Sequence, residues 1–149
     1  MKQNDNFTKY ISELFEEFDN LKSRKDKLAF LKEHKDNDMF KVVLQGTFDP
    51  NIKWYMPKDL SYTPDAAPIG LNPSNLHMEL PKCTVFARGH YKGKVVSDKR
   101  LKELLLQVLE SMHPAESMLY EQMLKKKLKI KGLTESLVLE VFPDLYREV

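Results

Sequence analysis

The N-terminal third of the chain places apolar side chains every three or four positions, the spacing of amphipathic helices. Three such segments follow one another, with capping residues at Ser23 before the second and at Asn37 or Asp38 before the third. The third must end before Pro50, because the residue that precedes a proline avoids the helical region. The apolar positions are Phe7, Ile11, Leu14, Phe15 and Phe18, then Leu28 and Leu31, then Met39, Phe40, Val43 and Leu44. We therefore predict three helices between residues 6 and 48.

The stretch from residue 50 to residue 95 is rich in proline and glycine, which predicts a long connection with little regular structure. Its aromatic residues, among them Trp54, Tyr55 and Tyr62, predict that it packs on the helices and is not a free linker. The pattern from Cys83 to Ala87 allows short strands. We therefore expect a proline-rich loop insert that holds short strands at most.

Helical spacing returns after residue 96. Ser97 or Asp98 is placed to cap the clearest helix, and Thr134 to cap a last helix that ends at Pro143. Between them, Pro114 suits a first helical turn, and the pattern predicts a helix from Ala115 to Leu128. The apolar positions of the three helices are Leu101, Leu104, Leu105, Val108, Leu109 and Met112, then Met118, Leu119, Met123 and Leu124, then Leu137, Val138, Val141 and Phe142. The prediction is an all-α fold: one compact module over residues 1–149, with about six helices over 6–48 and 97–142 and the loop insert over 50–95.

Composition places the chain among ordinary folded proteins. A length of 149 residues fits one domain, with 42% hydrophobic and 31% charged residues. No apolar run approaches the roughly 20 residues that a bilayer requires, and the polar N-terminus lacks the pattern of a secretion signal. The single cysteine, Cys83, excludes an intramolecular disulfide. We therefore expect a cytoplasmic protein with no membrane partner.

Motifs for catalysis are missing from the sequence. His77, Cys83 and His90 lack the spacing of a metal site, and the glycines match no phosphate-binding loop. The carboxylates fall mainly on predicted helix surfaces, where solvated charge is the usual state. An enzyme built around His77 and His90 would need both side chains to converge in one pocket. We expect no catalytic residue, cofactor or metal.

The basic residues form three groups beside predicted helix ends, although the net charge is only +2. The groups are Lys22, Arg24, Lys25 and Lys27; then Lys92, Lys94, Lys99, Arg100 and Lys102; then Lys125, Lys126, Lys127, Lys129 and Lys131. Lysine runs on helices are usually a solvated face, but distributed positive charge also suits the phosphate backbone of a duplex. The third group leads into a turn at Gly132 and a helix start at Thr134 and Ser136. Two interpretations stay open: this helix start binds a phosphate group, or it is an ordinary capped turn.

Both ends of the chain resemble a known family. The string Leu128-Lys129-Ile130-Lys131-Gly132-Leu133-Thr134-Glu135-Ser136, followed by Val141-Phe142-Pro143-Asp144-Leu145, is similar to the end of the helical DNA-binding domain of ATP-dependent DNA ligases. Residues 23–27, 35–41 and 53–55 are similar to the opening helices of ligases of the T-even phage type, whereas residues 57–96 match poorly. The resemblance implies a helical module that grips nicked duplex DNA across the minor groove through phosphate contacts. The KxDG motif, whose lysine accepts AMP, is absent, so no ligase activity is expected.

These observations predict a non-catalytic accessory protein that binds double-stranded DNA, nicked or intact, through its backbone without reading sequence. The resemblance further implies a phage gene, a place in the host cytoplasm, and a role in replication, repair or recombination. The expected DNA contacts are Lys25, Lys27, Lys94, Lys99, Arg100, Lys125, Lys129, Lys131, Gly132, Thr134 and Ser136.

The alternative is a protein-interaction module that binds a replication protein or a host protein with a ligase-like fold. It is suggested by the apolar and acidic segment from Phe142 to Val149, which has the character of a tail that docks in a partner's groove. Packing of the same segment into the protein's own core explains its composition equally well.

Overall fold

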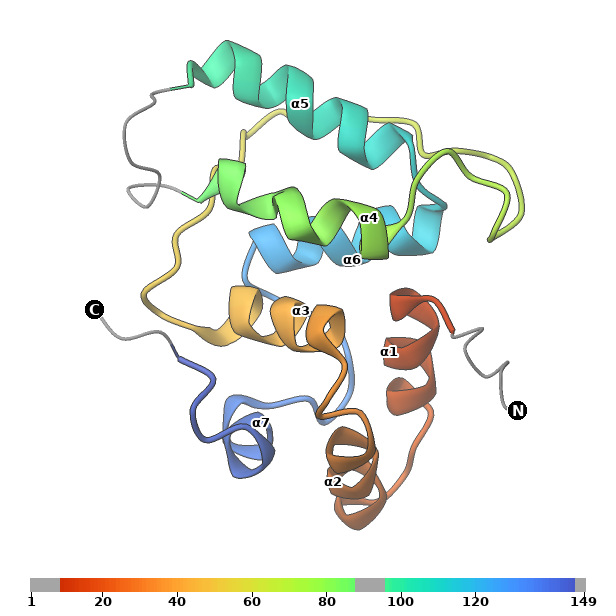
Figure 1. Cartoon of the computed structure of the whole chain (residues 1–149), viewed down its shortest axis with the longest axis vertical. Coiled ribbons are helices and arrows are strands. Elements are labelled where there is room, and N and C mark those ends of the chain that lie inside the picture. Colours follow the sequence, from red (N-terminus) through yellow and green to blue (C-terminus); the bar gives the residue numbers. More distant parts are fainter. Residues whose placement is uncertain (1–8, 88–95, 147–149) are drawn as a thin grey trace.

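The computed structural model describes residues 9–87 and 96–146, and the elements in these ranges are helices. In chain order they are α1 (Ile11–Asp19), α2 (Arg24–Glu33), α3 (Asp38–Phe48), α4 (Leu76–Glu79), the 3₁₀ helix η2 (Leu80–Phe86), α5 (Asp98–Glu110), α6 (Pro114–Leu124) and α7 (Glu135–Val141) (Figure 1). Within the described ranges, the β-pairing is limited to an isolated bridge between Trp54 and Ala87. The predicted all-α class is confirmed.

Most helices begin where the sequence places a capping residue. The side chains of Ser23, Asn37, Ser97 and Thr134 each accept a hydrogen bond from a backbone N–H in the first turn of the helix that follows. Pro114 occupies the first turn of α6, where its missing N–H costs no helical hydrogen bond. These boundaries follow from local sequence, and the predictions for them are confirmed.

α6 lies in the middle of the molecule and packs against α1, α3 and α5. α5 lies at one end of the longest axis, whereas α2 and α7 pack together at the other end (Figure 1). Side chains from every described helix join one hydrophobic cluster, with Tyr120, Leu105 and Phe40 among its fully buried members. The two ends of the molecule are therefore joined through one core.

The proline-rich segment contributes to this core, and the short strands that the sequence allowed from Cys83 to Ala87 do not form within the described residues, where Ala87 makes only the isolated bridge to Trp54. η2 covers this stretch, and its buried residues Leu80, Cys83 and Phe86 recur every three positions. Side chains three residues apart lie on one side of a 3₁₀ helix, so this spacing buries one face of η2. The prediction that the segment packs on the helices is confirmed, because the backbone N–H of Asp65 donates to the Met112 carbonyl over 2.9 Å.

A buried carboxylate joins three helix N-termini. Glu116 lies in the first turn of α6 and is 1% exposed. Its Oε2 accepts a hydrogen bond from the N–H of Ser12 in α1 over 2.9 Å, and its Oε1 accepts one from the N–H of Leu76 in α4 over 2.8 Å. Because a helix N-terminus carries partial positive charge, a carboxylate is favoured at this junction.

α6 departs from the sequence prediction at two points. It ends at Leu124 and does not continue to Leu128. Met118, expected to be buried, is 54% exposed because the described residues leave it uncovered on the outer side of α6. Both departures change which side chains α6 and the segment after it expose.

Candidate nucleic-acid interface

α6 ends in a Schellman motif formed by lysines. The N–H of Lys126 donates to the Met123 carbonyl and the N–H of Lys127 to the Gln122 carbonyl, each over 2.9 Å. Lys126 has a φ of 61°, in the left-handed region that glycine usually occupies at this position. The chain therefore leaves the helix after Leu124, which is why the helix is shorter than predicted.

The side chain of Lys126 holds this unusual turn in place. Its Nζ donates to the carbonyl oxygens of Asp49 over 2.6 Å and of Ile52 over 2.7 Å, just after α3. Burial of the ammonium group lowers its pKa, although the nearby Asp49 opposes this shift. The charge of Lys126 is therefore engaged within the protein and not offered at the surface.

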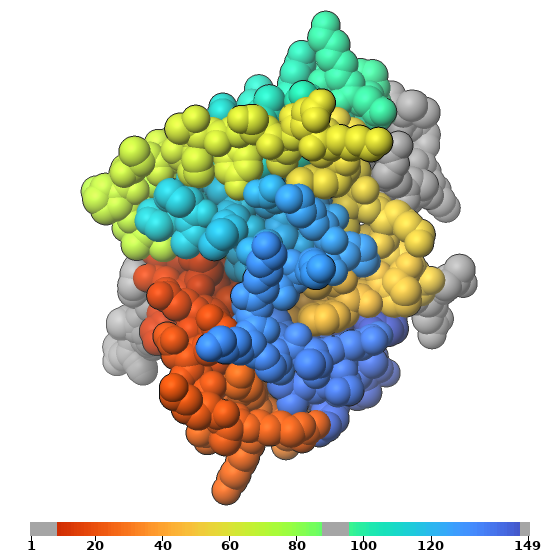
Figure 2. All heavy atoms as spheres, turned by 180° about the vertical axis from the view of Figure 1, so that it is seen from behind, coloured from red at the N-terminus to blue at the C-terminus, as the bar shows by residue number. Residues whose placement is uncertain are grey.

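Beyond the turn, exposed and covered residues alternate. Lys127, Lys129 and Lys131 are exposed, whereas Leu128 and Ile130 pack against the core. Such alternation is typical of extended backbone, in which side chains on one side repeat about every 6.6 Å. We call Lys127, Lys129 and Lys131 the lysine ridge; the segment that carries them crosses the face seen in Figure 2.

Hydrogen bonds hold the backbone of the lysine ridge at each of its three lysines. The N–H of Lys127 donates to the Gln122 carbonyl, that of Lys129 to the Gln122 Oε1 over 3.1 Å, and that of Lys131 to the Asp19 Oδ1 over 2.8 Å. The ridge is therefore fixed to both α6 and α1. Its side chains project from an ordered backbone.

The ammonium groups of the lysine ridge have no ion-pair partner among the described residues. The neighbouring Lys125, by contrast, pairs with Glu121 over 3.0 Å within the last turn of α6. Three lysines without such an ion pair on one held segment concentrate positive charge there, although the net charge of the chain is small.

Lys27, expected to contact DNA, instead holds the turn after the lysine ridge. It is 7% exposed, its Nζ donates to the Lys131 carbonyl over 2.7 Å, and the same atom lies 5.2 Å from the centre of the Phe18 ring. A Cβ on Gly132 would lie 2.6 Å from that Nζ, and Gly132 has a φ of +73°. Lys27 and Gly132 are therefore explained by packing and turn geometry.

Thr134 and Ser136 are exposed at the start of α7, as expected, but their hydroxyls are engaged. Thr134 Oγ1 accepts a hydrogen bond from the N–H of Leu137 and lies 3.3 Å from Ser136 Oγ. α7 has seven residues, so its N-terminus has a small dipole. The contacts of Thr134 and Ser136 are therefore those of an ordinary capped helix start.

One contact joins the first basic group to the third, through Lys27 and Lys131. Lys25 is exposed in the first turn of α2, and Lys27, two residues further on, bonds to the Lys131 carbonyl. Next to Lys25, Arg24 pairs with Glu140 of α7. Lys25 therefore lies at the α2 and α7 end of the molecule, on a different face of α2 from the one that Lys27 turns towards Lys131.

The second basic group lies apart from the other two. Lys99 and Arg100 are exposed in the first turn of α5, which is at the opposite end of the longest axis from α2 and α7 (Figure 1). Arg100 also pairs with Glu103 over 3.1 Å. Lys94 lies outside the described residues. The expected contact set therefore divides between two separate surfaces.

Sequence reasoning left Lys127 out of the expected contacts, although it stands in the third basic group. The predicted helix to Leu128 concealed the two-residue alternation of lysine with Leu128 and Ile130. That alternation favours an extended segment with one basic side, and it is the sequence signal that could have identified Lys127.

The C-terminal segment is packed and is not a free tail in the described part of the chain. Phe142 is 5% exposed and Leu145 1% exposed, and the hydroxyl of Tyr146 donates to Glu135. The sequence hint for a docking tail is thus accounted for by core packing up to Tyr146. Residues 147–149 lie outside the described residues.

No other described cluster suggests chemistry. Residues 9–87 and 96–146 hold no group of three or more His, Cys, Asp or Glu side chains placed to bind a metal ion, and His90 lies outside them. Their helices include none with the length and apolar character needed to cross a bilayer.

Comparison with known proteins gives a family match over most of the chain. A model of a family of unknown function (DUF6433) matches residues 14–130, which covers most of the chain and ends within the lysine ridge segment. No curated protein matches the chain.

Proposed function

The chain belongs to the DUF6433 family, whose function is unknown, and we propose that it is a non-catalytic protein that binds double-stranded DNA through its phosphate backbone. The lysine ridge and Lys25 make the contacts in this proposal. The expectation of no catalysis rests on the absent KxDG motif and on histidines without metal-site spacing.

The lysine ridge is the observation that carries the proposal. Three exposed ammonium groups, without ion-pair partners among the described residues, project from a segment in which the N–H of each lysine is hydrogen-bonded. Binding to phosphates releases counterions from DNA, and each neutralised phosphate adds to affinity at low salt. Because the backbone of the ridge is already held, little backbone conformational entropy is lost when it binds.

The same surface favours binding without sequence specificity. Lysine is a compact charge that contacts phosphates, whereas base recognition commonly uses arginine, asparagine or glutamine forks. Two such groups close to this surface or to α2 are engaged, because Arg24 pairs with Glu140 and Gln122 Oε1 accepts from the Lys129 N–H. We therefore propose contacts that position the protein on DNA without reading the bases.

The cellular role rests on sequence resemblance. The likeness of residues 23–55 and 128–145 to the DNA-binding domain of phage ligases supports an accessory role in replication, repair or recombination, from a phage gene and in the host cytoplasm. The matched family carries no assigned function, so this role stays a prediction.

Fluorescence anisotropy titration of a labelled duplex across salt concentrations tests the proposal. With four lysines contacting phosphates, the slope of log Kobs against log salt is expected near −3.6, at about −0.9 per contact. A variant with glutamine at Lys127, Lys129 and Lys131 should retain its fold and lose about 2.7 units of that slope. No binding by the natural protein at low salt would overturn the proposal.

A matched variant separates the lysine ridge from net charge. Replacing Lys99, Arg100 and Lys102 with glutamine also removes three positive charges, but from the opposite end of the molecule. We expect this variant to keep nearly all of the affinity and of the salt slope. An equal loss in both triple variants would show that the ridge is not the contact surface.

A further inference from the structure

A pocket away from the lysine ridge is lined by η2, α5 and α6. It has a volume of about 440 Å³, a size typical of small-molecule sites. We call it the Tyr120 pocket. Its wall is mainly apolar, which suits a small ring or hydrocarbon group. The residues that give it this character are Val85 and Phe86 of η2, Leu104 and Val108 of α5, and Tyr120 of α6.

The phenol hydroxyl of Tyr120 has no hydrogen-bond partner among the described residues, although Tyr120 is only 1% exposed. The large majority of buried polar side-chain atoms in proteins have a partner. Burial raises the pKa of this hydroxyl well above its ordinary value, and the nearby Cys83 and Glu79 add to the shift. The hydroxyl therefore stays protonated near neutral pH and has a hydrogen to donate. Its unused bonding capacity indicates a place where a bound molecule supplies the acceptor.

A buried carboxylate also lines the Tyr120 pocket. Glu79, the last residue of α4, is 9% exposed, and its Oε2 accepts a hydrogen bond from the Ser74 hydroxyl. Its Oε1 lies 4.0 Å from the Lys82 Nζ and accepts no hydrogen bond from the described residues. Lys82 thus offsets the charge of Glu79 without using the acceptor position at Oε1. The pocket therefore combines a hydrogen-bond donor, Tyr120, and an acceptor, Glu79, with apolar walls.

We propose that the Tyr120 pocket binds a small aromatic molecule that carries a neutral carboxamide group. The carbonyl oxygen of that group accepts from the Tyr120 hydroxyl, its N–H donates to Glu79 Oε1, and the ring packs beside Val108. A carboxamide presents an acceptor and a donor side by side, and the Lys82 ion pair leaves little charge for a cation to neutralise. The inference does not depend on DNA binding, because the pocket shares no residue with the lysine ridge.

Benzamide is the first probe, and acetophenone is its matched control. Acetophenone keeps the ring and the carbonyl group and replaces the NH₂ group with a methyl group. The full chain, labelled with ¹⁵N, is titrated with each probe, and amide shifts are followed. We expect benzamide to produce saturable shifts at Glu79, Phe86, Leu104 and Tyr120. Acetophenone should bind about tenfold more weakly, because its methyl group donates no hydrogen bond to the Glu79 carboxylate.

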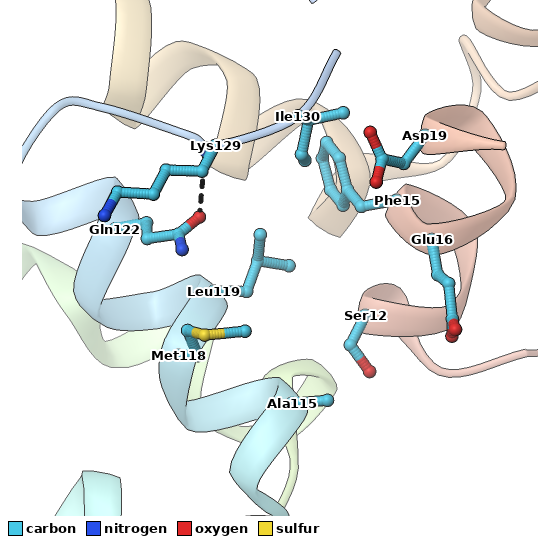
Figure 3. A pocket seen from close by; sticks show the side chains of 10 residues that line it. All are labelled: Ser12, Phe15, Glu16, Asp19, Ala115, Met118, Leu119, Gln122, Lys129 and Ile130. Carbon is cyan, nitrogen blue, oxygen red and sulfur yellow. Dashed lines mark hydrogen bonds between the residues drawn. The ribbon is translucent and has the colours of Figure 1, made fainter.

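Tyr120→Phe removes only the unpartnered hydroxyl. It should weaken benzamide binding about fivefold and leave the protein at least as resistant to urea, because a buried hydroxyl without a partner does not stabilise the fold. Ser12→Ala is the matched control. The Ser12 Oγ is also buried without a partner among the described residues, but it lines the groove between α1 and α6 (Figure 3). Ser12→Ala should therefore leave the affinity for benzamide unchanged.

Glu79→Gln tests the acceptor while keeping the shape of the side chain. The glutamine amide oxygen can accept from the Ser74 hydroxyl in place of Oε2, which puts the NH₂ group at the position of Oε1. The NH₂ group of benzamide then meets another donor. The preference for benzamide over acetophenone should therefore be lost in this variant, and a retained preference would contradict the role of Glu79.

The results that overturn the inference are distinct from those that overturn DNA binding. No saturable shift at the Tyr120 pocket up to the solubility limit of benzamide, or equal affinities in Tyr120→Phe and Ser12→Ala, would overturn it. Benzylamine, a cation, is the third probe, and tighter binding of benzylamine than of benzamide would assign the pocket to amines instead. The glutamine variant of the lysine ridge should bind benzamide as the natural protein does, whether or not DNA binding is found.

Discussion

Replacement of Glu116 with alanine tests how the helices are joined. The buried carboxylate accepts hydrogen bonds from the N–H groups of Ser12 and Leu76, at the starts of α1 and α4. Alanine leaves both N–H groups buried without an acceptor, and each such loss costs about 1–3 kcal/mol. We therefore expect the free energy of unfolding to fall by about 4 kcal/mol, a large part of the 5–15 kcal/mol typical of a domain.

Glutamine at the same position separates charge and geometry from side-chain volume. Its amide oxygen can accept one of the two N–H groups, whereas its NH₂ group faces the other donor. The expected loss is about 2 kcal/mol, between the natural protein and the alanine variant.

Urea denaturation followed by circular dichroism measures these differences, with thermal melting as a second assay. At about 2–4 °C per kcal/mol for a chain of this size, Glu116→Ala should melt about 8–16 °C lower. Glu103→Ala is the matched control; it removes an exposed carboxylate paired with Arg100 and should cost less than about 1 kcal/mol. If Glu116→Ala lost no more stability than this control, the buried carboxylate would not be joining the helices.

Two further predictions concern the end of α6 and the buried thiol. Lys126→Ala removes both hydrogen bonds to the carbonyls after α3 and should lower the free energy of unfolding, measured in urea, by about 2 kcal/mol. Lys126→Gly removes the same bonds but should recover about 1 kcal/mol of that loss, because glycine adopts a positive φ freely. Equal losses in the two variants would contradict the importance of the positive φ at this turn. Burial raises the pKa of Cys83 to about 11, so its reaction with a disulfide reagent at pH 8 should be about 100-fold slower in the native than in the urea-unfolded protein. Because the raised pKa favours the protonated folded state, the thiol's contribution to stability is complete below about pH 9 and is lost as the pH rises towards 11. A native protein that reacts as fast as the unfolded one would refute the burial of this thiol.

The sequence alone was sufficient for the helices whose signals are local. The caps at Ser23, Asn37, Ser97 and Thr134 were predicted because a capping side chain bonds to a backbone N–H only two or three residues away. The all-α class followed from the same signals. The separation of basic residues into three groups was also visible, although their relation in space was not.

Tertiary structure decided the role of each lysine. Lys25 and Lys27 differ by two positions on α2, yet one is exposed and the other is covered by the Lys131 carbonyl and the Phe18 ring. Lys126 and Lys127 are neighbours, yet one tethers α6 to the end of α3 and the other belongs to the lysine ridge. The charge pattern gives the positions of the lysines along the chain. It does not predict which backbone carbonyls accept hydrogen bonds from them.

Contacts between residues far apart in the sequence also explain why η2, the exposure of Met118 and the end of α6 were not predicted. The sequence by itself determined where helices start, because capping and helical spacing involve residues within about four positions of one another. Only the folded chain decided which faces are covered, because Asp49 reaches Lys126 and Glu116 reaches Ser12 from distant parts of the sequence. Burial depends on these partners, so a residue's exposure, and with it the lysine ridge and the Tyr120 pocket, is a property of the packed molecule.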